Sequence, residues 1–432
     1  MATGYRMHCV TSVSYFDDWI HDLQGRPLSL SLPFIPGNQP HRGDLVTSYF
    51  DNLLPDNENI RRRLAQRYRT SSQEPFELLA VLGRDCVGAI QLLPQHEEPV
   101  GVYDISGRSL DETDIAELLR NATSTEPLGR HEDGTDYLRL SIAGAQEKTA
   151  LLRHAGIWME PHGSTPTTHI LKLPMGLVGG MRADMRTSVE NEWLCSKIVA
   201  AYGLPVANCE IAQFEDQKVL VVERFDRRLS EDKDWIMRLP QEDLCQATGV
   251  PPHQKYQADG GPGITQIMDI LLGSDDATTD RSNFFKAQLV FWLLSATDGH
   301  AKNFSIVHLP QSRYIATPLY DVLSTHPIIG SGPNQLARHK AKLAMGVQSK
   351  NLHYLIDKIQ RRHWAAQAKH VGLGEREAET TIEMLINTTD QVISTVSEIV
   401  PAGFPTGLAE TIFEGLRSQR DRLARMPSTI AA

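Results

Sequence analysis

Apolar positions follow two periods along the chain, and these periods predict where its strands and helices lie. In residues 28–32 leucines alternate with serines, which is the period of a half-buried strand. Short apolar runs predict further strands at residues 86–93, 137–142, 148–153, 169–173, 209–214, 218–225, 304–308 and 314–316. Apolar residues at helical spacing predict helices at residues 74–82, 189–202, 264–272 and 284–296, and several more within residues 350–425.

One further helix is indicated by its start. Ser109 and Glu112 fit a capping box, and Ile115, Leu118 and Leu119 form the apolar face behind it. The stretch at residues 121–136 is rich in Gly, Thr, Glu and Asp and is predicted to be a linker. The elements group into three predicted domains: an α/β subdomain at residues 1–125, a sheet with one helix at 137–235, and a mostly helical part at 236–432. The fold class is therefore predicted to be α+β.

Composition excludes several classes of protein. The 432 residues carry a net charge of −10, which argues against a free-standing nucleic-acid-binding protein. The five cysteines are scattered without C-x-x-C or zinc spacing, so reduced thiols are expected. The N-terminal residues lack a signal-peptide core, and the most apolar stretch, at residues 289–296, is far shorter than the ~20 residues of a membrane span. A cytoplasmic protein without membrane contact is expected.

Three side chains that carry oxygen stand out after the predicted helix at residues 284–296. Asp298 is followed five positions later by Asn303, and Asp321 comes 18 residues after that. This is the order that protein kinases use: the first Asp orients the attacking hydroxyl, and the Asn and second Asp bind Mg²⁺. Asp298 is the candidate catalytic residue, and Asn303 and Asp321 are the candidate metal ligands. Each residue alone is more often a turn or a cap, so the hypothesis depends on their joint spacing.

Two segments are candidates for binding the phosphates of ATP. Lys172 lies in an otherwise apolar strand, where an ammonium group needs a negative partner. An edge-strand lysine that points into solvent is the alternative. The small residues of a loop before the strand at 148–153 could bring backbone N–H groups close to phosphate. This loop consists of Ala143, Gly144, Ala145, Gln146, Glu147 and Lys148, and a plain hairpin turn is its alternative.

The remaining candidates for ATP contacts are placed by their position in the sequence. Glu223, Arg224 and Phe225 end a predicted strand and could offer main-chain hydrogen bonds to adenine, or could be a strand end with a paired glutamate. His300, Ala301 and Lys302 belong to the same loop as Asp298, and Tyr320 precedes Asp321. Basic clusters at residues 61–69 and 358–369 indicate solvated helix faces or, alternatively, contacts with a phosphate backbone.

The chain resembles the HipA family of bacterial serine/threonine kinase toxins over nearly its whole length. The segments that carry the resemblance are PLSLSLP, SYFDNLLPDNENIRRRL, LLAVLGRDCVGAIQLLP, SIAGAQEKTALL, PTTHILKLP, VVERFDRR, LPQEDLCQATG, DGGPGI, ATDGHAKNFS, PLYDVLS and KLAMG. The resemblance implies a two-lobed protein-kinase-like fold with an additional N-terminal subdomain and an all-helical C-terminal part. It also implies ATP and Mg²⁺ as cofactors. The resemblance further implies the catalytic, metal-binding and ATP-binding roles that are named above for individual residues.

The resemblance implies further properties that no spacing could indicate. Ser141 matches the serine that family members autophosphorylate, which expels the phosphate loop and stops the kinase. Family members pair with a HipB-like helix-turn-helix antitoxin dimer and repress their operon by binding operator DNA with it. Their target is a translation component, glutamyl-tRNA synthetase, and its phosphorylation arrests growth and promotes persistence. Two alternatives stay open: a small-molecule phosphotransferase of the aminoglycoside-kinase type, and a non-catalytic co-repressor that serves as a binding module.

Overall fold

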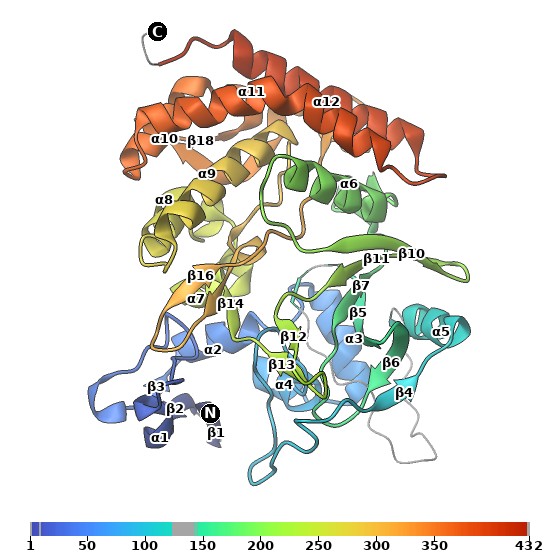
Figure 1. The fold of residues 1–432 in the computed structure, drawn as a ribbon, viewed down its shortest axis with the longest axis vertical. Helices are drawn as coiled ribbons and strands as arrows, with labels where there is room; N and C mark the ends of the chain where they lie inside the picture. The colour runs from blue at the N-terminus through green and yellow to red at the C-terminus, as the bar shows by residue number, and fades with distance from the viewer. Residues whose placement is uncertain (1, 8–9, 123–142, 145, 430–432) are drawn as a thin grey trace. The chain divides into compact units, whose positions relative to one another are not determined.

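The computed structural model describes residues 2–7, 10–122, 143–144 and 146–429. The chain divides into two compact units. Unit 1 comprises Met1–Leu173, Glu210–His253 and Ser305–Tyr314, and unit 2 comprises Pro174–Cys209, Gln254–Phe304 and Ile315–Ala432. Figure 1 shows the elements of both units coloured along the chain. The predicted strand at residues 137–142 lies outside the described residues.

A six-stranded sheet is the centre of unit 1. Its order is β10 (Cys209–Phe214), β11 (Gln217–Glu223), β7 (His169–Lys172), β5 (Lys148–His154), β6 (Ile157–Pro161) and β4 (Gly107–Ser109). Strands β5, β7, β10 and β11 confirm the predictions at residues 148–153, 169–173, 209–214 and 218–225, whereas β4 and β6 were not predicted. Helix α5 (Glu112–Ala122) buries Ile115 and Leu119 against Leu151, Leu171 and Val221 of this sheet.

The capping box of α5 was predicted with the wrong residues, Ser109 and Glu112. The main-chain N–H of Asp114 donates to the carboxylate of Asp111 over 2.8 Å, and the N–H of Asp111 donates to the carboxylate of Asp114 over 3.1 Å. Asp111 and Asp114 therefore form the reciprocal pair that was assigned to Ser109 and Glu112. An aspartate is as good an N-cap as a serine, so the local sequence fits both registers.

The N-terminal part of unit 1 contains a small sheet and four helices. The sheet consists of β1 (Ala2–Met7), β2 (Val10–Tyr15) and β3 (His41–Arg42). The helices are α1 (Asp17–His21), α2 (Asp44–Asp51), α3 (Glu58–Tyr68) and α4 (Pro75–Leu82), with a 3₁₀ turn η1 (Pro36–Asn38). Helix α4 confirms the helix predicted at residues 74–82. Val46, Tyr49, Leu53, Leu78 and Leu82 pack together in a core of this part of the chain.

The strand predicted at residues 28–32 is wrong, because its serines bind distant polar groups. Ser29 and Leu32 form one isolated bridge, and the N–H of Leu32 donates to the carbonyl of Ser29 over 3.1 Å. The Ser29 hydroxyl donates to the carboxylate of buried Glu242, and the N–H of Leu30 donates to the same carboxylate over 2.8 Å. The alternation of leucine and serine thus marks a turn that is anchored on Glu242.

The strand predicted at residues 86–93 is also wrong, because arginine side chains donate hydrogen bonds to its main-chain carbonyl groups. Arg224 and Arg227 both donate to the carbonyl of Cys86, over 2.9 and 2.8 Å, and Arg227 also donates to the carbonyl of Gly88 over 2.8 Å. The carbonyl of Cys86 thus accepts from two donors, one for each lone pair, and has none left for a neighbouring strand. The segment is therefore irregular, and it is anchored on a cluster of buried charges.

This buried charge cluster consists of Asp85, Asp226, Arg224, Arg227 and Arg238 in unit 1. Asp85 contacts all three guanidinium groups at 3.0–3.4 Å and also accepts from the hydroxyl of Thr167 over 2.6 Å. Burial acts to raise the pKa of Asp85, but the charges of Arg227, Arg224 and Arg238 hold it well below its ordinary value. The cluster therefore connects residues 85–88 to the six-stranded sheet through ionised groups.

Unit 1 is completed by the hairpin β12 (Arg227–Leu229) and β13 (Ile236–Arg238), by β14 (Gln241–Asp243) paired with β15 (Ser305–His308), and by α7 (Leu244–Thr248). Strand β16 (Tyr314–Ala316) and the 3₁₀ turn η2 (Pro252–Gln254) span the unit boundaries. Strands β15 and β16 confirm the predictions at residues 304–308 and 314–316.

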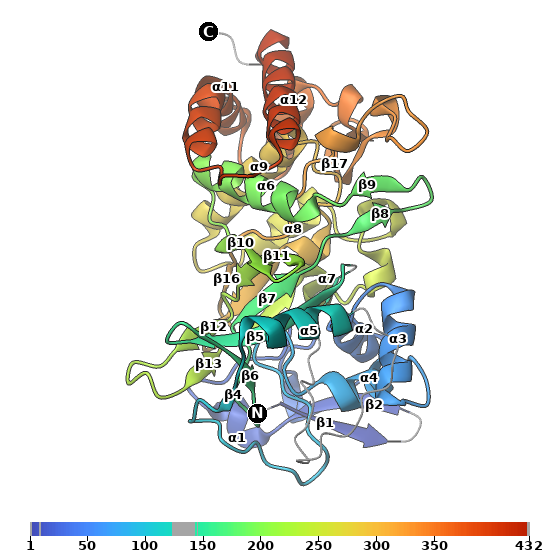
Figure 2. The same ribbon diagram turned by 90° about the vertical axis from the view of Figure 1, so that its right-hand side faces the viewer.

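Unit 2 is mostly helical, and α9 (Ala277–Leu293) lies at its centre. This helix packs against α8 (Ile264–Leu271), α11 (Glu375–Glu398) and α12 (Thr406–Arg425), which are seen from two directions in Figures 1 and 2. Helices α6 (Ser188–Ala201) and α10 (Arg361–His370) complete the set. Helices α6, α8 and α9 confirm the predictions at residues 189–202, 264–272 and 284–296, and α10–α12 confirm those within residues 350–425.

Two hairpins of unit 2 were not predicted. They are β8 (Gly176–Val178) with β9 (Ala183–Met185), and β17 (Lys342–Gln348) with β18 (Leu352–Leu355). The remaining elements are the 3₁₀ turns η3 (Gln257–Asp259), η4 (Ala301–Asn303), η5 (His326–Ile328), η6 (Arg338–Lys340) and η7 (Ile356–Lys358). Within the described part of the chain, no helix is long and apolar enough to span a membrane.

Candidate active site

The loop that carries Asp298 follows directly after α9 and wraps onto its aromatic face. The side chain of Asn303 donates to the main-chain carbonyl of Asp298 over 2.7 Å, and the N–H of His300 donates to the same carbonyl over 2.8 Å. A Cβ atom at Gly299 would lie 2.4 Å from the ring of Phe291, so only glycine allows the backbone to approach this closely. The loop therefore has a defined shape that holds Asp298 and Asn303 side by side.

The carboxylate of Asp298 is exposed, with 54% of its side chain accessible. The hydroxyl of Tyr256 donates to its Oδ1 atom, and His300 Nε2 lies 3.8 Å from the same atom, which is beyond hydrogen-bond distance. The Tyr256 ring packs edge-on against the His300 ring at 5.1 Å. His300 therefore packs at this corner of the loop, and its contact with ATP stays a prediction. Tyr256 was not among the predicted residues, because no local pattern links it to a loop 42 positions away.

Asn303, Ala301 and Lys302 are buried, and the Asp321 segment lies against them. The hydroxyl of Tyr320 donates to the carbonyl of Lys302 over 2.9 Å, which brings Tyr320 and Asp321 next to the loop. Asp321 has φ 61°, in the left-handed region that is uncommon for residues other than glycine. Such outliers occur often at functional sites, which fits the predicted metal ligand.

The Asp321 segment is fixed to its surroundings on both sides. Before it, the N–H of Leu319 donates to the carbonyl of Pro205 over 2.8 Å. After it, Ser324 exchanges two hydrogen bonds with Asn191 of α6, over 2.8 and 2.9 Å, and its hydroxyl donates to the carbonyl of Leu294 over 2.7 Å. Because Leu294 directly follows α9, the Asp298 loop and the Asp321 segment are anchored at the end of the same helix. The two segments that carry the predicted catalytic centre therefore belong to unit 2, and the hydroxyl of Tyr320 joins them.

The phosphate-loop candidate lies in unit 1, where β5 begins. Gly144 has φ 114°, and a Cβ atom there would lie 2.5 Å from Nζ of Lys148. The Lys148 ammonium folds back onto the carbonyl of Ala143. Gln146 donates to the carbonyl of Leu173, and the N–H of Leu173 donates to the carbonyl of Glu147 over 3.0 Å. The loop is therefore joined to the end of β7 beside Lys172.

Lys148 and Lys172 are direct cross-strand partners on β5 and β7. Like charges at opposed positions of an antiparallel pair repel each other, and Lys172 is only 6% exposed. Two ammonium groups on the same face of a sheet are well suited to bind an anion that bears several negative charges. This pairing favours the phosphate role of Lys172 over that of a solvated edge lysine.

The proposed adenine-contacting segment ends β11. The N–H of Arg224 donates to the carbonyl of Thr168 over 2.9 Å, and its guanidinium belongs to the buried charge cluster. Arg224 therefore uses both its main-chain donor and its side chain within unit 1. Glu223 pairs with His169 in the register of β11 and β7. Main-chain contact with adenine at Glu223 or Phe225 stays a prediction.

Two predicted site residues cannot be placed. Ser141, the predicted autophosphorylation site, and Ala145 lie outside the described residues. Among the described residues, no group of three or more His, Cys, Asp or Glu side chains could hold a metal ion. A metal site at Asn303 and Asp321, with one amide and one carboxylate ligand, stays a prediction.

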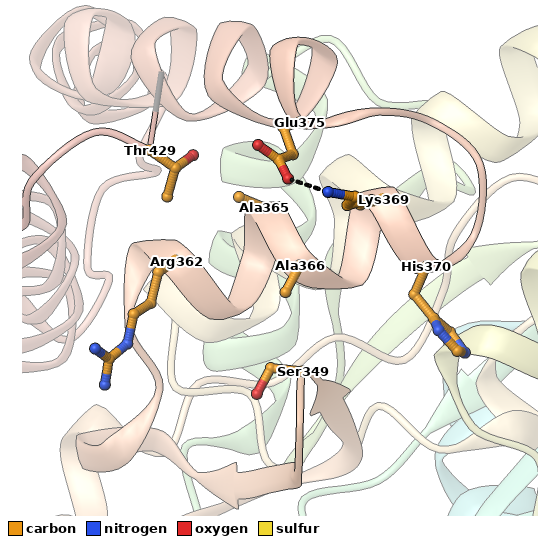
Figure 3. A pocket seen from close by; sticks show the side chains of 8 residues that line it. All are labelled: Ser349, Arg362, Ala365, Ala366, Lys369, His370, Glu375 and Thr429. Carbon is orange, nitrogen blue, oxygen red and sulfur yellow. Dashed lines mark ion pairs between the residues drawn. The ribbon is translucent and has the colours of Figure 1, made fainter. Parts of the chain in front are cut away.

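A separate pocket of unit 2 has a volume of about 500 Å³ and is shown in Figure 3. It is lined by Ser349, Arg362, Ala365, Ala366, Lys369, His370, Glu375 and Thr429, none of which is a predicted site residue. Two of these residues, Lys369 and Glu375, form an ion pair of 3.1 Å, drawn as a dashed line in Figure 3. Part of its positive charge is therefore already neutralised within the chain.

Two family models match the chain. Residues 6–93 match the HipA N-terminal domain, and residues 140–393 match the HipA-like C-terminal domain, which alone covers more than half of the 432 residues. The putative kinase Y4mE of Sinorhizobium fredii is 34% identical over 390 residues, which cover 89% of this chain and 86% of the relative. The serine/threonine-protein kinase toxin HipA of Shewanella oneidensis is 28% identical over 332 residues, which cover 72% and 70%.

The structure is similar to that of HipA from Shewanella oneidensis in a complex with HipB and operator DNA. The TM-score is 0.79 at 22% identity, and the match covers 98% of this chain and 95% of that chain. HipA has a kinase-like fold, so the predicted α+β, kinase-like fold is confirmed. The C-terminal part is not all-helical, because it contains the β17–β18 hairpin, and the boundaries of the three predicted domains stay a prediction. Two matching family models and a relative that spans most of the chain agree on one conclusion: the chain belongs to the HipA family.

Proposed function

We propose that this chain is an ATP-dependent serine/threonine protein kinase that acts as the toxin of a toxin–antitoxin pair. The observation that carries the proposal is the loop after α9, in which Asn303 is hydrogen-bonded to Asp298 beside the Tyr320–Asp321 segment. A kinase needs a hydroxyl-orienting Asp next to metal-binding oxygen atoms. Relatives that are named as kinases support this activity.

In the proposed reaction, the hydroxyl oxygen of a protein serine or threonine attacks the γ-phosphorus of ATP. Asp298 orients this hydroxyl and receives its proton, while the bond between the γ-phosphorus and the bridging oxygen breaks and ADP leaves. Tyr256 donates to Oδ1 of Asp298, so the second carboxylate oxygen can accept the proton of the substrate. The positive charges of Lys148 and Lys172 bind the phosphate groups of ATP and offset the repulsion among these groups.

The residues present fit a magnesium ion. The side-chain nitrogen of Asn303 donates to the carbonyl of Asp298, which leaves its Oδ1 atom as the oxygen that can bind a cation. Together with the carboxylate of Asp321 this gives two hard oxygen ligands, the kind that Mg²⁺ prefers beside phosphate oxygens. When bound, Mg²⁺ neutralises negative charge on the phosphate groups.

Replacing Asp321 by asparagine is expected to raise the Mg²⁺ concentration needed for half-maximal activity by about tenfold or more, because the site loses its charged ligand. Asparagine tolerates the left-handed conformation of residue 321 well, so the backbone should keep its course. The measurement is the initial rate of phosphoryl transfer over a range of MgCl₂ concentrations. Asp259→Asn, at an exposed position of η3, is the matched control. An unchanged Mg²⁺ requirement in Asp321→Asn would remove Asp321 from the site.

We further propose that the partner is a HipB-like helix-turn-helix antitoxin dimer, through which the chain reaches operator DNA. The structure of HipA of Shewanella oneidensis was solved with HipB and operator DNA, and the structural match to that protein covers nearly all of this chain. The intact set of Asp298, Asn303, Asp321 and Lys172 weighs against a purely non-catalytic co-repressor. A small-molecule phosphotransferase would need the same catalytic residues. Only the identity of the phosphorylated substrate separates it from a protein kinase.

The finer parts of the proposal concern substrates. The family resemblance supports glutamyl-tRNA synthetase as the target, with growth arrest and persistence as the result, and it supports autophosphorylation of Ser141. A phosphate group on Ser141 would place up to about two negative charges two residues before Ala143, where they would repel bound triphosphate.

The proposed function is tested by incubating the purified chain with ATP labelled at the γ-phosphate and a bacterial extract. Labelled proteins are then identified by mass spectrometry. The expected result is label on serine or threonine of a translation component and on Ser141 of the chain itself. Label on small molecules alone would indicate the phosphotransferase, and an absence of transfer despite antitoxin binding would indicate the co-repressor.

A further inference from the structure

The phosphate-loop candidate is contacted by the segment of the N-terminal part of the chain that runs from Pro55 into α3. The N–H of Asp56 donates to the carbonyl of Gly144 over 3.1 Å, and Pro55 and Gly144 form an isolated parallel bridge. The guanidinium of Arg63 forms an ion pair with the carboxylate of Glu147. These contacts all lie within unit 1, and they hold the loop at both of its ends.

The contacting segment is itself firmly braced. Asn57 caps α3 by accepting from the N–H groups of Asn59 and Ile60, over 2.8 and 3.4 Å. Arg61 donates to the carbonyl of Pro55 and pairs with Asp51 of α2, each over 2.5 Å. The turn at Pro55 and the first turns of α3 therefore form one rigid support, and Arg63 projects from it toward Glu147.

Charge explains why this support matters for a nucleotide site. Glu147 immediately precedes Lys148, which is the cross-strand partner of Lys172. A free carboxylate at this position would compete with phosphate for the two lysines and would repel a bound triphosphate. Arg63 compensates that charge. The two side chains are only 14% and 28% exposed, so solvent and salt screen their pairing less than that of a surface pair.

We propose that Arg63 is a positioning residue for the nucleotide: by holding and neutralising Glu147 it keeps the loop in the shape that binds the phosphates of MgATP. The inference rests on the proposed function, and it adds that the N-terminal part of the chain sets nucleotide affinity. Arg63 belongs to a basic cluster and Glu147 to the predicted phosphate loop, and no local pattern connects two residues that are 84 positions apart.

The test is a double-mutant cycle on the full chain, with binding of a non-hydrolysable ATP analogue and Mg²⁺ measured by calorimetry. Arg63→Ala is expected to raise the Kd about three- to tenfold, the scale of a partly buried ion pair. In the Glu147→Gln background, the same change is expected to alter the Kd less than about twofold, because its partner charge is gone. Arg63→Lys keeps the charge without the planar fork and is expected to lie between the wild type and Arg63→Ala.

Arg62→Ala is the matched control, because Arg62 is an exposed neighbour on the same helix and should leave the Kd unchanged. Equal effects of Arg63→Ala in both backgrounds, or an effect no larger than that of Arg62→Ala, would overturn the inference. Thermal melting verifies that each variant is folded; should Arg63→Ala not fold, Arg63→Lys in the two backgrounds gives the same decision. A wild-type chain that binds no analogue would contradict the proposed function instead, so the two failures are distinguishable.

Discussion

Replacing Asp298 by alanine is expected to lower the rate of ATP-dependent phosphoryl transfer by roughly 10²–10⁴-fold, the usual contribution of a group that takes a proton in the transition state. The carboxylate is the only part of the residue that the reaction would use. The rate is measured as transfer of labelled γ-phosphate to protein, with the same preparation assayed for binding of an ATP analogue and Mg²⁺. Binding is expected to change only a few-fold, because Lys148 and Lys172, which we propose to bind the phosphate groups, are untouched.

This loss should not result from unfolding. The hydrogen bonds that shape the loop use the main-chain carbonyl of Asp298, which alanine retains. The removed side chain is 54% exposed, and substitutions at such positions usually change the free energy of unfolding by less than about 0.5 kcal/mol. Asp269→Ala, at an exposed position of α8, is the control for a lost surface carboxylate. Near wild-type rates in a folded Asp298→Ala preparation would show that another group orients the hydroxyl.

Replacing Asp85 by asparagine is expected to reduce the free energy of unfolding by about 3–5 kcal/mol, the cost of removing one partner from a buried ion pair. Arg224 and Arg227 would then keep only the carboxylate of Asp226 within the buried charge cluster, and Arg238 would lose its contact with Asp85. The measurement is urea unfolding at pH 7, followed by fluorescence. Asp216→Asn removes a carboxylate from an exposed ion pair with Arg120 and should leave stability nearly unchanged. A loss in Asp85→Asn no larger than in this control would show that the cluster stabilises nothing.

The same cluster predicts how stability depends on pH. Because the pKa of folded Asp85 lies below its ordinary value, the stabilisation is present at neutral pH and is lost as the pH falls below about 5, toward the folded pKa. The pKa of Asp226 is shifted in the same direction: burial acts to raise it, but Arg224 and Arg227 lower it further. The difference in stability between the wild type and Asp85→Asn should therefore narrow in acid. A difference that is constant from pH 7 to pH 3 would contradict this linkage.

The sequence predicted those parts of the fold whose cause is local. Strands β5 and β7 and helices α8 and α9 follow from their apolar residues, because burial of one side of an element leaves a periodic pattern and burial of all sides leaves a continuous apolar run. The strand predicted at residues 86–93 failed for a non-local reason: its carbonyl groups accept from Arg224 and Arg227, about 140 positions away. No periodicity contains that information.

The candidate site divides in the same way. Asp298 and Asn303 are five positions apart, and their spacing indicates a shared loop, which the hydrogen bond between them now supports. Tyr256 and Arg63 were not predicted, because their partners are distant in the sequence. Tyr256 lies 42 positions from Asp298, and Arg63 lies 84 positions from Glu147. A lysine in an apolar strand was a usable signal for Lys172, but its pairing with Lys148 depends on the register of β5 and β7.

The proposed kinase activity depends most on Asn303 and Asp321 as the ligands of the metal ion of MgATP. The most direct test is a crystal structure of the full chain with Mg²⁺ and a non-hydrolysable ATP analogue. We expect Mg²⁺ to be bound by Oδ1 of Asn303 and the carboxylate of Asp321, with Asp298 facing the γ-phosphate. A nucleotide bound elsewhere, or a metal ion held without either residue, would contradict it.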